Sequence, residues 1–167
     1  MTAVTLRIGE GHDTHRTISD RRLILGGVVI TGAPFGLDGH SDADVLLHAI
    51  TDAVLGAAGL GDIGEWFANT DERWRGADSA LLLQTVLQEL ERKSLQLVNL
   101  DCTVHAEKPR MGPWKPLIRQ RLSELLGVNL QQINVKAKSG ESVGPVGRGE
   151  AISATAVVLL QQTSGSG

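Results

Sequence analysis

The sequence predicts a single α/β (α+β) domain, and three observations indicate it. The chain has 167 residues, of which 41% are hydrophobic, enough for one core but not for two domains of usual size. Apolar residues recur with strand-like and helix-like periods in the order strands, helix, helix, strand, helix, strand, strand. Neither a linker nor an internal repeat interrupts this order. We therefore expect one domain over residues 1–162, followed by a flexible tail at residues 163–167.

The first elements should be short strands. Residues 5–11 are β-rich and punctuated by glycine. Residues 22–30 place two apolar runs around Gly26 and Gly27, which indicates a hairpin or a bulged strand. The next segment, TGAPFGLDG at residues 31–39, has the composition of a loop.

Residues 39–64, GHSDADVLLHAITDAVLGAAGLGDIG, predict an apolar helix with a polar entrance. Ser41 is a suitable helix cap, and Asp42 and Asp44 would then lie in the first turn, where a carboxylate is favoured. Asp44, His48 and Asp52 recur every four residues, so they should share one face of the helix. That face is either simply a wet side, on which the histidine bonds a neighbouring carboxylate, or a functional surface.

The second half of the chain should alternate helices and strands. We expect the first helix to end near residues 59–61, a long surface loop over 62–79, and a second helix from 78 or 79 to about 94. A strand over 97–107 would place one set of side chains on a common face: Val98, Leu100, Cys102, Val104 and Ala106.

The remaining elements follow from proline, glycine and apolar runs. Residues 108–116 contain three prolines and predict a loop, and a third helix should run from about 117 to 126 and end at Gly127. Strands are expected at 133–138 and 151–160. The glycine-rich loop SGESVGPVGRGE, residues 139–150, would join them.

Charge and composition restrict the partners. The net charge is −3 and basic residues are scattered, so we expect no nucleic-acid partner. No stretch approaches the roughly 20 apolar residues of a membrane span, so we expect no membrane association. The N-terminal sequence lacks the features of a signal peptide, and the single Cys102 allows no internal disulfide. We therefore expect a cytoplasmic protein in which Cys102 is a core residue.

Asp13, His15 and His48 are candidate metal ligands. Asp13 and His15 are two residues apart, so both point to one side if the first strand continues through them, whereas His12 points to the other. With His48 from the helix they would supply three nitrogen and oxygen ligands. Three protein ligands leave the fourth position of a zinc ion open, as in catalytic sites. A carboxylate near His48 would then orient its ring.

Two segments suit a phosphorylated substrate. His40 and Ser41 would lie at a helix N-terminus, where backbone N–H groups favour a phosphate. Residues 138–141, Lys-Ser-Gly-Glu, combine a cation, a hydroxyl and a carboxylate in a flexible loop, which suits a phosphate with a divalent cation. The alternative for the second segment is a plain turn between two edge strands, with Lys138 and Glu141 solvated.

The motifs together resemble a known family. They are RIGEGHDTH, HSDADVLLHAITDAVLGAAGLGDIG, NTD, AEKPRMGP and VKAKSGE followed by GRGE, and they extend from about Arg7 to Leu160, nearly the whole chain. This pattern resembles the 2-C-methyl-D-erythritol 2,4-cyclodiphosphate synthases of the non-mevalonate isoprenoid pathway. Those enzymes are phosphorus-oxygen lyases that convert 4-diphosphocytidyl-2-C-methyl-D-erythritol 2-phosphate into the cyclic diphosphate and CMP.

The resemblance implies an architecture and two metal sites. The sheet would be mixed and covered by helices on one face, and three subunits would pack sheet to sheet as a homotrimer with active sites between neighbours. One Zn²⁺ per subunit would bind Asp13, His15 and His48. Glu141 would hold Mg²⁺ or Mn²⁺ together with the CDP-linked substrate.

The resemblance also assigns roles to side chains. His40 and Ser139 would be catalytic, because they would stabilise charge on the transferring phosphoryl group. The loop over residues 106–112, supplied by the adjacent subunit, would bind cytidine, and Asp62 to Gly64 would hold substrate hydroxyls. The full substrate-binding set is Asp13, His15, His40, Ser41, Asp62, Ile63, Gly64, Phe67, Asn69, Asp71, Ala106, Lys108, Pro109, Arg110, Met111, Gly112, Lys138, Ser139, Glu141, Pro145 and Arg148.

The chain departs from the family pattern at four places. Residues 67–71 read Phe-Ala-Asn-Thr-Asp where Phe-Pro-Asp-Thr-Asp is common, so a carboxylate has become an amide. Ser139 replaces a threonine, and Arg110 replaces a lysine. Pro145 replaces an aromatic residue that often lines the central cavity of the trimer, although Arg148 remains. We expect the chemistry to be retained and the central-cavity ligand to be altered.

The implied reaction is an intramolecular phosphoryl transfer. The 2-phosphate attacks the β-phosphorus and CMP leaves, so no side-chain nucleophile is needed, and the cations neutralise the phosphates. Two alternatives stay open. A zinc-dependent phosphohydrolase would need a base such as Asp44 or Asp52. A non-catalytic trimer would bind an isoprenoid diphosphate in its central channel, with Arg148 as the anion contact.

Overall fold

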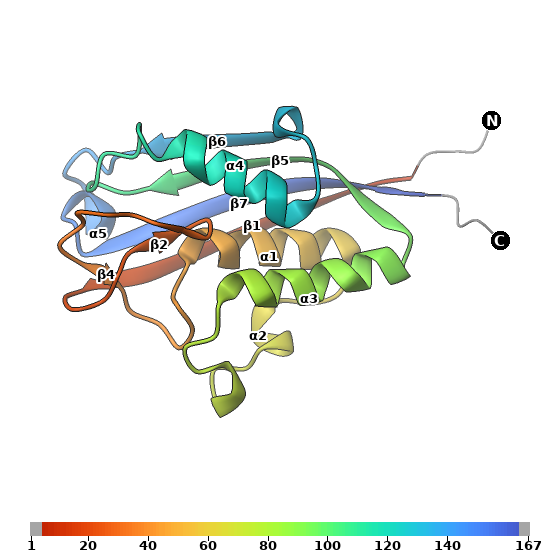
Figure 1. Cartoon of the computed structure of the whole chain (residues 1–167), viewed down its shortest axis with the longest axis horizontal. Helices are drawn as coiled ribbons and strands as arrows, with labels where there is room; N and C mark the ends of the chain where they lie inside the picture. Colours follow the sequence, from red (N-terminus) through yellow and green to blue (C-terminus); the bar gives the residue numbers. More distant parts are fainter. Residues whose placement is uncertain (1–4, 164–167) are drawn as a thin grey trace.

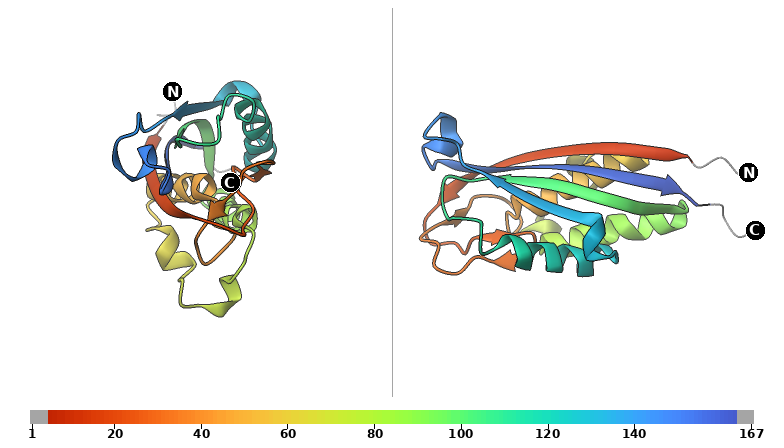
Figure 2. Two further views of the ribbon diagram at one scale, coloured as in Figure 1. Left: turned by 90° about the vertical axis from the view of Figure 1, so that its left-hand side faces the viewer. Right: turned by 90° about the horizontal axis from the view of Figure 1, so that it is seen from above.

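A computed structural model describes residues 5–163, which form a mixed five-stranded sheet with helices on one face (Figures 1 and 2). The strand order is β4-β1-β7-β5-β6. β7 is antiparallel to both of its neighbours, β1 and β5, whereas β5 and β6 are parallel. The strands are β1 (Leu6–Ile18), β4 (Gly36–Leu37), β5 (Leu95–His105), β6 (Ile133–Lys138) and β7 (Ala151–Gln162). The expected mixed sheet, covered on one side, is therefore confirmed.

β1 is longer than the predicted strand at residues 5–11. It pairs with β7 from Leu6 opposite Gln161 to Arg16 opposite Ala151. The sequence obscures this length because glycines and polar residues, rather than an apolar alternation, occupy the covered face. The side chains of Asp13 and His15 are half-buried on that face, and His12 is exposed on the other, as predicted.

Residues 22–30 form a hairpin, the first of the two alternatives. β2 (Ile24–Leu25) and β3 (Val28–Val29) pair antiparallel. Gly26 and Gly27 join them with φ of 62° and 73°, the left-handed values that a type I′ turn requires at both central residues. β4, which pairs with the end of β1, lies in the segment predicted to be a loop.

The long helix α1 (Val45–Ala58) begins later than predicted, and Ser41 is not its cap. Asp44 is the N-cap, and its Oδ1 accepts hydrogen bonds from the amides of Leu46 and Leu47 at 3.2 and 3.0 Å. The predicted placement of Asp42 and Asp44 in the first turn is therefore wrong. The helix ends at Gly59, whose φ is 69°, as predicted.

α1 lies directly against β1 over two glycines. A Cβ atom on Gly9 would lie 1.9 Å from the carbonyl oxygen of Ala53, and one on Gly11 would lie 2.0 Å from that of Ala49. Any side chain at these positions would push the helix off the strand. The helix also contacts β7 and α3, and most of its side chains are buried.

The other long elements differ from prediction mainly at their ends. α3 (Ser79–Arg92) is capped by Asp78, and α4 (Lys115–Leu126) begins two residues early and ends at Gly127. β6 has the predicted bounds, and β7 extends two residues further. β5 starts and ends two residues before the predicted strand, and a bulge between Leu97 and Asn99 shifts its alternation. Beyond this bulge the predicted covered face is confirmed for Leu100, Cys102 and Val104.

Three predicted loops contain short helices. The segment after α1 includes α2 (Ile63–Trp66) and a 3₁₀ turn at Glu72–Trp74, and α5 (Gly144–Gly147) interrupts the glycine-rich loop. A further 3₁₀ turn, Leu130–Gln132, precedes β6. Of the predicted tail, Thr163 bonds the carbonyl of Ser94, and residues 164–167 lie outside the described residues. Within the described part of the chain, no helix has the length and apolar character needed to cross a membrane.

Replacing Gly11 by alanine should lower the free energy of unfolding by about 2–3 kcal/mol, because the added methyl meets helix backbone rather than a movable side chain. Urea unfolding of the metal-free protein measures this. Gly56→Ala, on the α1 side of the same contact, is the matched control. Its methyl would meet only the Glu10 carbonyl oxygen at 3.8 Å and the Gly9 Cα at 4.0 Å, both ordinary contacts, so it should be neutral or stabilising by about 0.5–1 kcal/mol. Equal stability of Gly11→Ala and wild type would contradict the close contact.

The thiol of Cys102 should resist modification in the native protein. The side chain is 1% exposed, and burial together with the charge of Asp101 raises the pKa of Cys102 to about 12. The thiolate needed for reaction is therefore scarce at any pH below that value. A maleimide reagent should leave the folded protein unlabelled at about pH 8 and label it fully in denaturant. Rapid labelling of the folded protein would show that this strand opens readily.

Candidate active site

Asp13 and His15 of β1 meet His48 of α1. Oδ2 of Asp13 lies 2.9 Å from Nε2 of His15 and 3.0 Å from Nδ1 of His48. The two ring nitrogens are 3.1 Å apart. Among the residues that the structure describes, these three alone form a group able to hold a metal ion, with ligand atoms all within 4.8 Å of one another. The metal triple predicted from spacing is thus brought together.

The partners of His15 indicate which nitrogen is free to bind. Its Nδ1 lies 2.6 Å from the carbonyl oxygen of Asp38, which can only accept, so Nδ1 carries the hydrogen. In the neutral ring the lone pair is then on Nε2, which faces Asp13 and His48. One carboxylate oxygen and two imidazole nitrogens around a common point suit a zinc ion, and a backbone carbonyl is a usual partner for the second nitrogen of a ligating histidine.

The electrostatics of the group keep Asp13 ionised. Burial opposes ionisation, but hydrogen bonds and charge from His15 and His48 outweigh it, so the pKa of Asp13 lies well below its ordinary range. Burial likewise lowers the pKa of His15, but the Asp13 carboxylate outweighs this and raises it above 6.5. Asp13 therefore offers a charged oxygen at neutral pH, and a cation would compete with a proton at His15.

Asp44 belongs to the scaffold and not to a wet helix face. Its carboxylate is fully buried and accepts from the amides of Gly26 and Gly27 at 2.9 and 2.6 Å, besides capping α1. The wet-face interpretation of the Asp44, His48 and Asp52 stripe is therefore wrong at its first position. The predicted placement of His40 and Ser41 at the helix N-terminus is also wrong, because both lie in the preceding turn and the Asp44 carboxylate accepts from the amides of Leu46 and Leu47.

A cavity of about 360 Å³ opens beside the metal group. Nine of the predicted site residues line it: Asp13, His15, His40, Ser41, His48, Ile63, Gly64, Phe67 and Asn69. Four lining residues were not predicted to be site residues: Gly39, Asp52, Trp74 and Leu82. The four-residue spacing from His48 did single out Asp52, although not as a site residue of the predicted reaction, whereas Trp74 lies in a segment without periodicity.

Asp52 and two aromatic rings shape the far side of the cavity. Oδ1 of Asp52 accepts from the amide of Ile63 at 2.7 Å, so it holds the start of α2, and burial raises the pKa of Asp52. Asp62 caps α2 and is exposed at the rim. The ring of Phe67 is buried and packs edge to face against the ring of Trp74, with 5.0 Å between the ring centroids. These contacts give the cavity an apolar wall opposite its polar residues.

Arg21 fixes the turn that carries His40 and Ser41. Its guanidinium donates to the carbonyl oxygens of Gly39 and Ser41 at 2.9 and 2.8 Å. Nε2 of His40 lies 3.1 Å from the carbonyl of Asp71, whose carboxylate is paired with a neighbouring arginine. His40 therefore donates through Nε2, which leaves its Nδ1 unprotonated when the ring is neutral.

The segments 106–112 and 138–141 lie together but apart from this cavity. The amide of Ala106 donates to the carbonyl of Lys138 at 2.9 Å, and that of Gly140 to the Glu107 carboxylate at 3.0 Å. β6, which carries residues 138–141 at its end, is three strands from β1, so about 14 Å separates them. Within residues 5–163, neither segment contributes to the lining of the Asp13 cavity.

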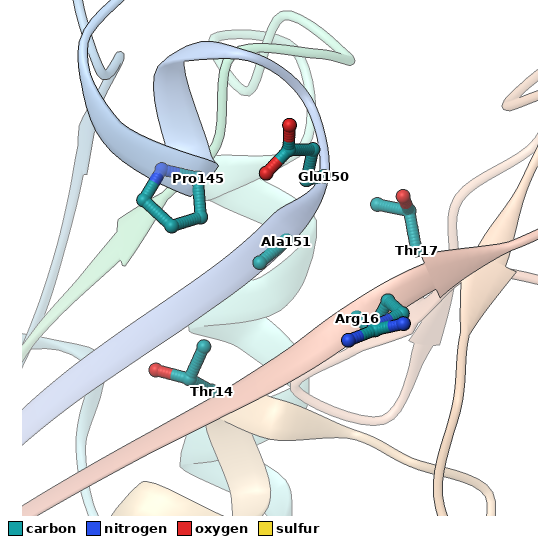
Figure 3. A pocket seen from close by; sticks show the side chains of 6 residues that line it. All are labelled: Thr14, Arg16, Thr17, Pro145, Glu150 and Ala151. Atoms are coloured by element: carbon teal, nitrogen blue, oxygen red, sulfur yellow. The ribbon is translucent and has the colours of Figure 1, made fainter.

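Pro145 and Arg148 lie at a third place. A cavity of about 570 Å³ is lined by Thr14, Arg16, Thr17, Pro145, Glu150 and Ala151, and Figure 3 shows Pro145 and Glu150 across it from β1. Thr14 and Arg16 alternate with Asp13 and His15 along β1, so the two cavities lie on opposite faces of the strand. Arg148 pairs with Glu150 at 2.8 Å.

Comparison with known proteins gives one consistent result. The YgbB family pattern matches residues 6–161. The 2-C-methyl-D-erythritol 2,4-cyclodiphosphate synthase of Synechococcus sp. (strain JA-2-3B'a(2-13)) is 53% identical over 157 residues, which cover 93% of this chain and 98% of that protein. The enzyme of the same name from Geobacter sulfurreducens is 51% identical over 157 residues. This match covers 94% of this chain and 99% of that enzyme.

Two solved structures have the same fold. A 2C-methyl-D-erythritol-2,4-cyclodiphosphate synthase bound to CDP superposes with a TM-score of 0.85 at 37% identity, covering 92% of this chain and 99% of that one. The bifunctional IspDF from Campylobacter jejuni gives a TM-score of 0.92 at 36% identity. This match covers 97% of this chain and 44% of the bifunctional protein.

Proposed function

The chain belongs to the YgbB family, and from that premise we propose how its residues carry out the reaction of its relatives. It is a 2-C-methyl-D-erythritol 2,4-cyclodiphosphate synthase type of enzyme, a phosphorus-oxygen lyase of isoprenoid precursor biosynthesis. The substrate is 4-diphosphocytidyl-2-C-methyl-D-erythritol 2-phosphate, and the products are the cyclic diphosphate and CMP. The observation that carries the proposal is the convergence of Asp13, His15 and His48 beside a cavity that also holds His40 and Ser41.

Asp13, His15 and His48 would hold one Zn²⁺ per subunit. The oxygen and nitrogen donors and their mutual distances suit that ion, which when bound would neutralise and orient phosphate oxygens. Ser41, at the cavity wall, would donate its hydroxyl to the same phosphate, and His40 would donate to it through Nδ1 as an imidazolium, because its Nε2 is held by the Asp71 carbonyl. Ile63 and Gly64, held by Asp52, would contact the hydroxyls of the methylerythritol.

Glu141 would hold Mg²⁺ or Mn²⁺, and the loop over 106–112 would bind the cytidine. These two segments are joined by hydrogen bonds and are separated from the chain's own metal group, so they would serve the cavity of an adjacent subunit together. A site completed by a second copy requires an oligomer. The uncovered face of the sheet, with Ile8 73% and Val157 42% exposed, supports packing of sheets around a threefold axis as a homotrimer.

The chemistry needs no protein nucleophile. An oxygen of the 2-phosphate bonds to the β-phosphorus while the bond from that phosphorus to the CMP oxygen breaks, and CMP departs with the electron pair. The side chains would position two anions and stabilise the charge of the transferring group, chiefly through His40, Lys138 and Ser139. The buried, unreactive Cys102 has no part in it. A single cysteine without a disulfide partner also fits a cytoplasmic location, which we propose for this protein.

The hydrolase alternative is disfavoured by the carboxylates it needs. Asp44 is fully buried and bonded to four amides, and Asp52 is engaged by the amide of Ile63. Asp44 is therefore not a free base beside the metal group, and one of the two carboxylate oxygens of Asp52 is already occupied. The non-catalytic alternative is disfavoured by the names of the relatives, and its anion contact Arg148 is already paired with Glu150 at 2.8 Å.

Replacing His48 by alanine should remove bound zinc and reduce turnover more than about 100-fold. Loss of a residue that only hydrogen-bonds a metal ligand typically reduces metal affinity or activity by about 10–100-fold, so a larger loss is expected for a ligand itself. Metal analysis of the purified protein and chromatographic detection of cyclic diphosphate and CMP measure the two effects. His12→Asn, on the opposite face of β1, is the control and should keep the metal. About one zinc per subunit in the His48 variant would show that the ligand assignment is wrong.

Two inactive variants should restore activity when mixed. His48→Ala keeps a sound cytidine loop, and Gly112→Trp keeps a sound metal group, since Gly112 does not line the metal cavity and a Cβ atom added there meets nothing within 4 Å in its own chain. Co-refolded in equal amounts, about a quarter of the sites between subunits would combine both intact halves. CMP release should then approach a quarter of the wild-type rate. Heterotrimers with no activity above each variant refolded alone would contradict a shared site.

A further inference from the structure

The two ring nitrogens of His48 have different partners. Nδ1 faces Asp13 at 3.0 Å and His15 at 3.1 Å, while Nε2 faces the hydroxyls of Ser79 at 2.9 Å and Ser41 at 3.0 Å. A neutral imidazole carries its hydrogen on one nitrogen only. Nδ1 can bind a metal only if the hydrogen is on Nε2, so the side chains around Nε2 decide whether His48 is a ligand.

Asp13 by itself would favour the wrong arrangement. Its carboxylate is an acceptor 3.0 Å from Nδ1, so a hydrogen placed on Nδ1 would gain a charge-assisted bond. The Ser41 hydroxyl does not prevent this. Its oxygen accepts from the amide of Ala43 at 3.2 Å, and its own hydrogen is free to point at a lone pair on Nε2. With these two partners alone, the metal-binding nitrogen would be blocked.

Ser79 differs from Ser41 because its hydrogen is already committed. Its Oγ lies 2.5 Å from Oδ1 of Asp42, and a carboxylate can only accept. The Ser79 hydroxyl therefore donates to Asp42 and presents a lone pair to Nε2 of His48. Nε2 must then be the donor.

Asp42 is itself held in place for this role. Its Oδ2 accepts from the Ser79 amide at 3.1 Å, its Oδ1 accepts from the amide of Asp44 at 3.1 Å, and its own amide donates to the carbonyl of Ala77 at 3.0 Å. Ser79 is 1% exposed at the first residue of α3. The half-buried Asp42 and His48 and the buried Ser79 thus form a chain of hydrogen bonds in which every hydrogen has one direction.

We propose that Asp42 and Ser79 are positioning residues that fix His48 with its hydrogen on Nε2, so that Nδ1 is the metal-binding atom. This inference rests on the metal group of the proposed function, but the position of the hydrogen is a property of the metal-free protein. It can therefore be tested without zinc and without substrate. Neither residue touches the reacting atoms.

The test compares Ser79→Ala, which removes the hydroxyl, with Asp42→Ala, which keeps the hydroxyl but frees its hydrogen. Thr51→Val is the matched control. It removes another buried hydroxyl of the same region, one that bonds only the carbonyl of Leu47 on α1. Nitrogen-15 NMR of histidine-labelled, metal-free protein at about pH 8.5, above the ordinary imidazole pKa of about 6.5, reports which nitrogen carries the hydrogen. Competition with a chelator measures zinc affinity.

Wild type and Thr51→Val should carry the hydrogen on Nε2. In both other variants it should move to Nδ1, and zinc should bind about 10–100-fold more weakly. A merely structural role of Ser79 would change stability without moving the hydrogen. If Ser79→Ala is folded, keeps the hydrogen on Nε2 and binds zinc as wild type does, the proposal is wrong, whatever becomes of Asp42→Ala. If the hydrogen moves but wild type binds no zinc, the positioning role stands and the zinc assignment fails.

Discussion

The distance between α1 and β1 is the constraint on which the metal group depends. Gly9 and Gly11 allow the helix backbone to touch the strand, and the carbonyl that Gly11 faces belongs to Ala49, the neighbour of His48. Two residues beyond Gly11 is Asp13. The contact that closes the core therefore also sets the separation of the ligands. A helix pushed outward by even one methyl group would carry His48 away from Asp13, so packing and chemistry are linked through the same few backbone atoms.

Much of this arrangement could be predicted from local patterns. Period-two alternation put Asp13 and His15 on one face of β1, and the helical period put His48 and Asp52 on one face of α1. The position of the helix start could not be predicted in this way. Ser41 and Asp44 are both good caps by residue type, and the choice between them is made by Gly26 and Gly27, whose amides bond the Asp44 carboxylate from a hairpin 17 and 18 residues away. Propensity contains no information on such a partner.

The grouping of site residues was harder to predict than their identity. Sequence order gives no strand order, and only the sheet shows that β6, with Lys138 at its end and Glu141 just beyond, lies at the edge opposite β1. Residues that the family resemblance assigns to one reaction are thus divided within a single chain. Trp74, which forms the aromatic wall together with the predicted Phe67, was missed for a related reason, since it lies in an aperiodic segment ordered by tertiary contacts. The convergence of Asp13, His15 and His48 does not depend on these other residues.

β1 separates two cavities, because Asp13 and His15 face α1 whereas Thr14 and Arg16 face the uncovered side. This makes the strand tolerant of exchange but intolerant of length change. A substitution at Thr14 or Arg16 should leave the metal group unchanged, because these side chains lie on the other face of the strand. One residue deleted between Gly11 and Asp13 would instead exchange the two faces and present Thr14 and Arg16 to His48, and one inserted residue would likewise turn Asp13 and His15 away from it. Divergence of such a chain can therefore proceed by substitution along this strand, while insertions and deletions must be confined to the loops at its ends.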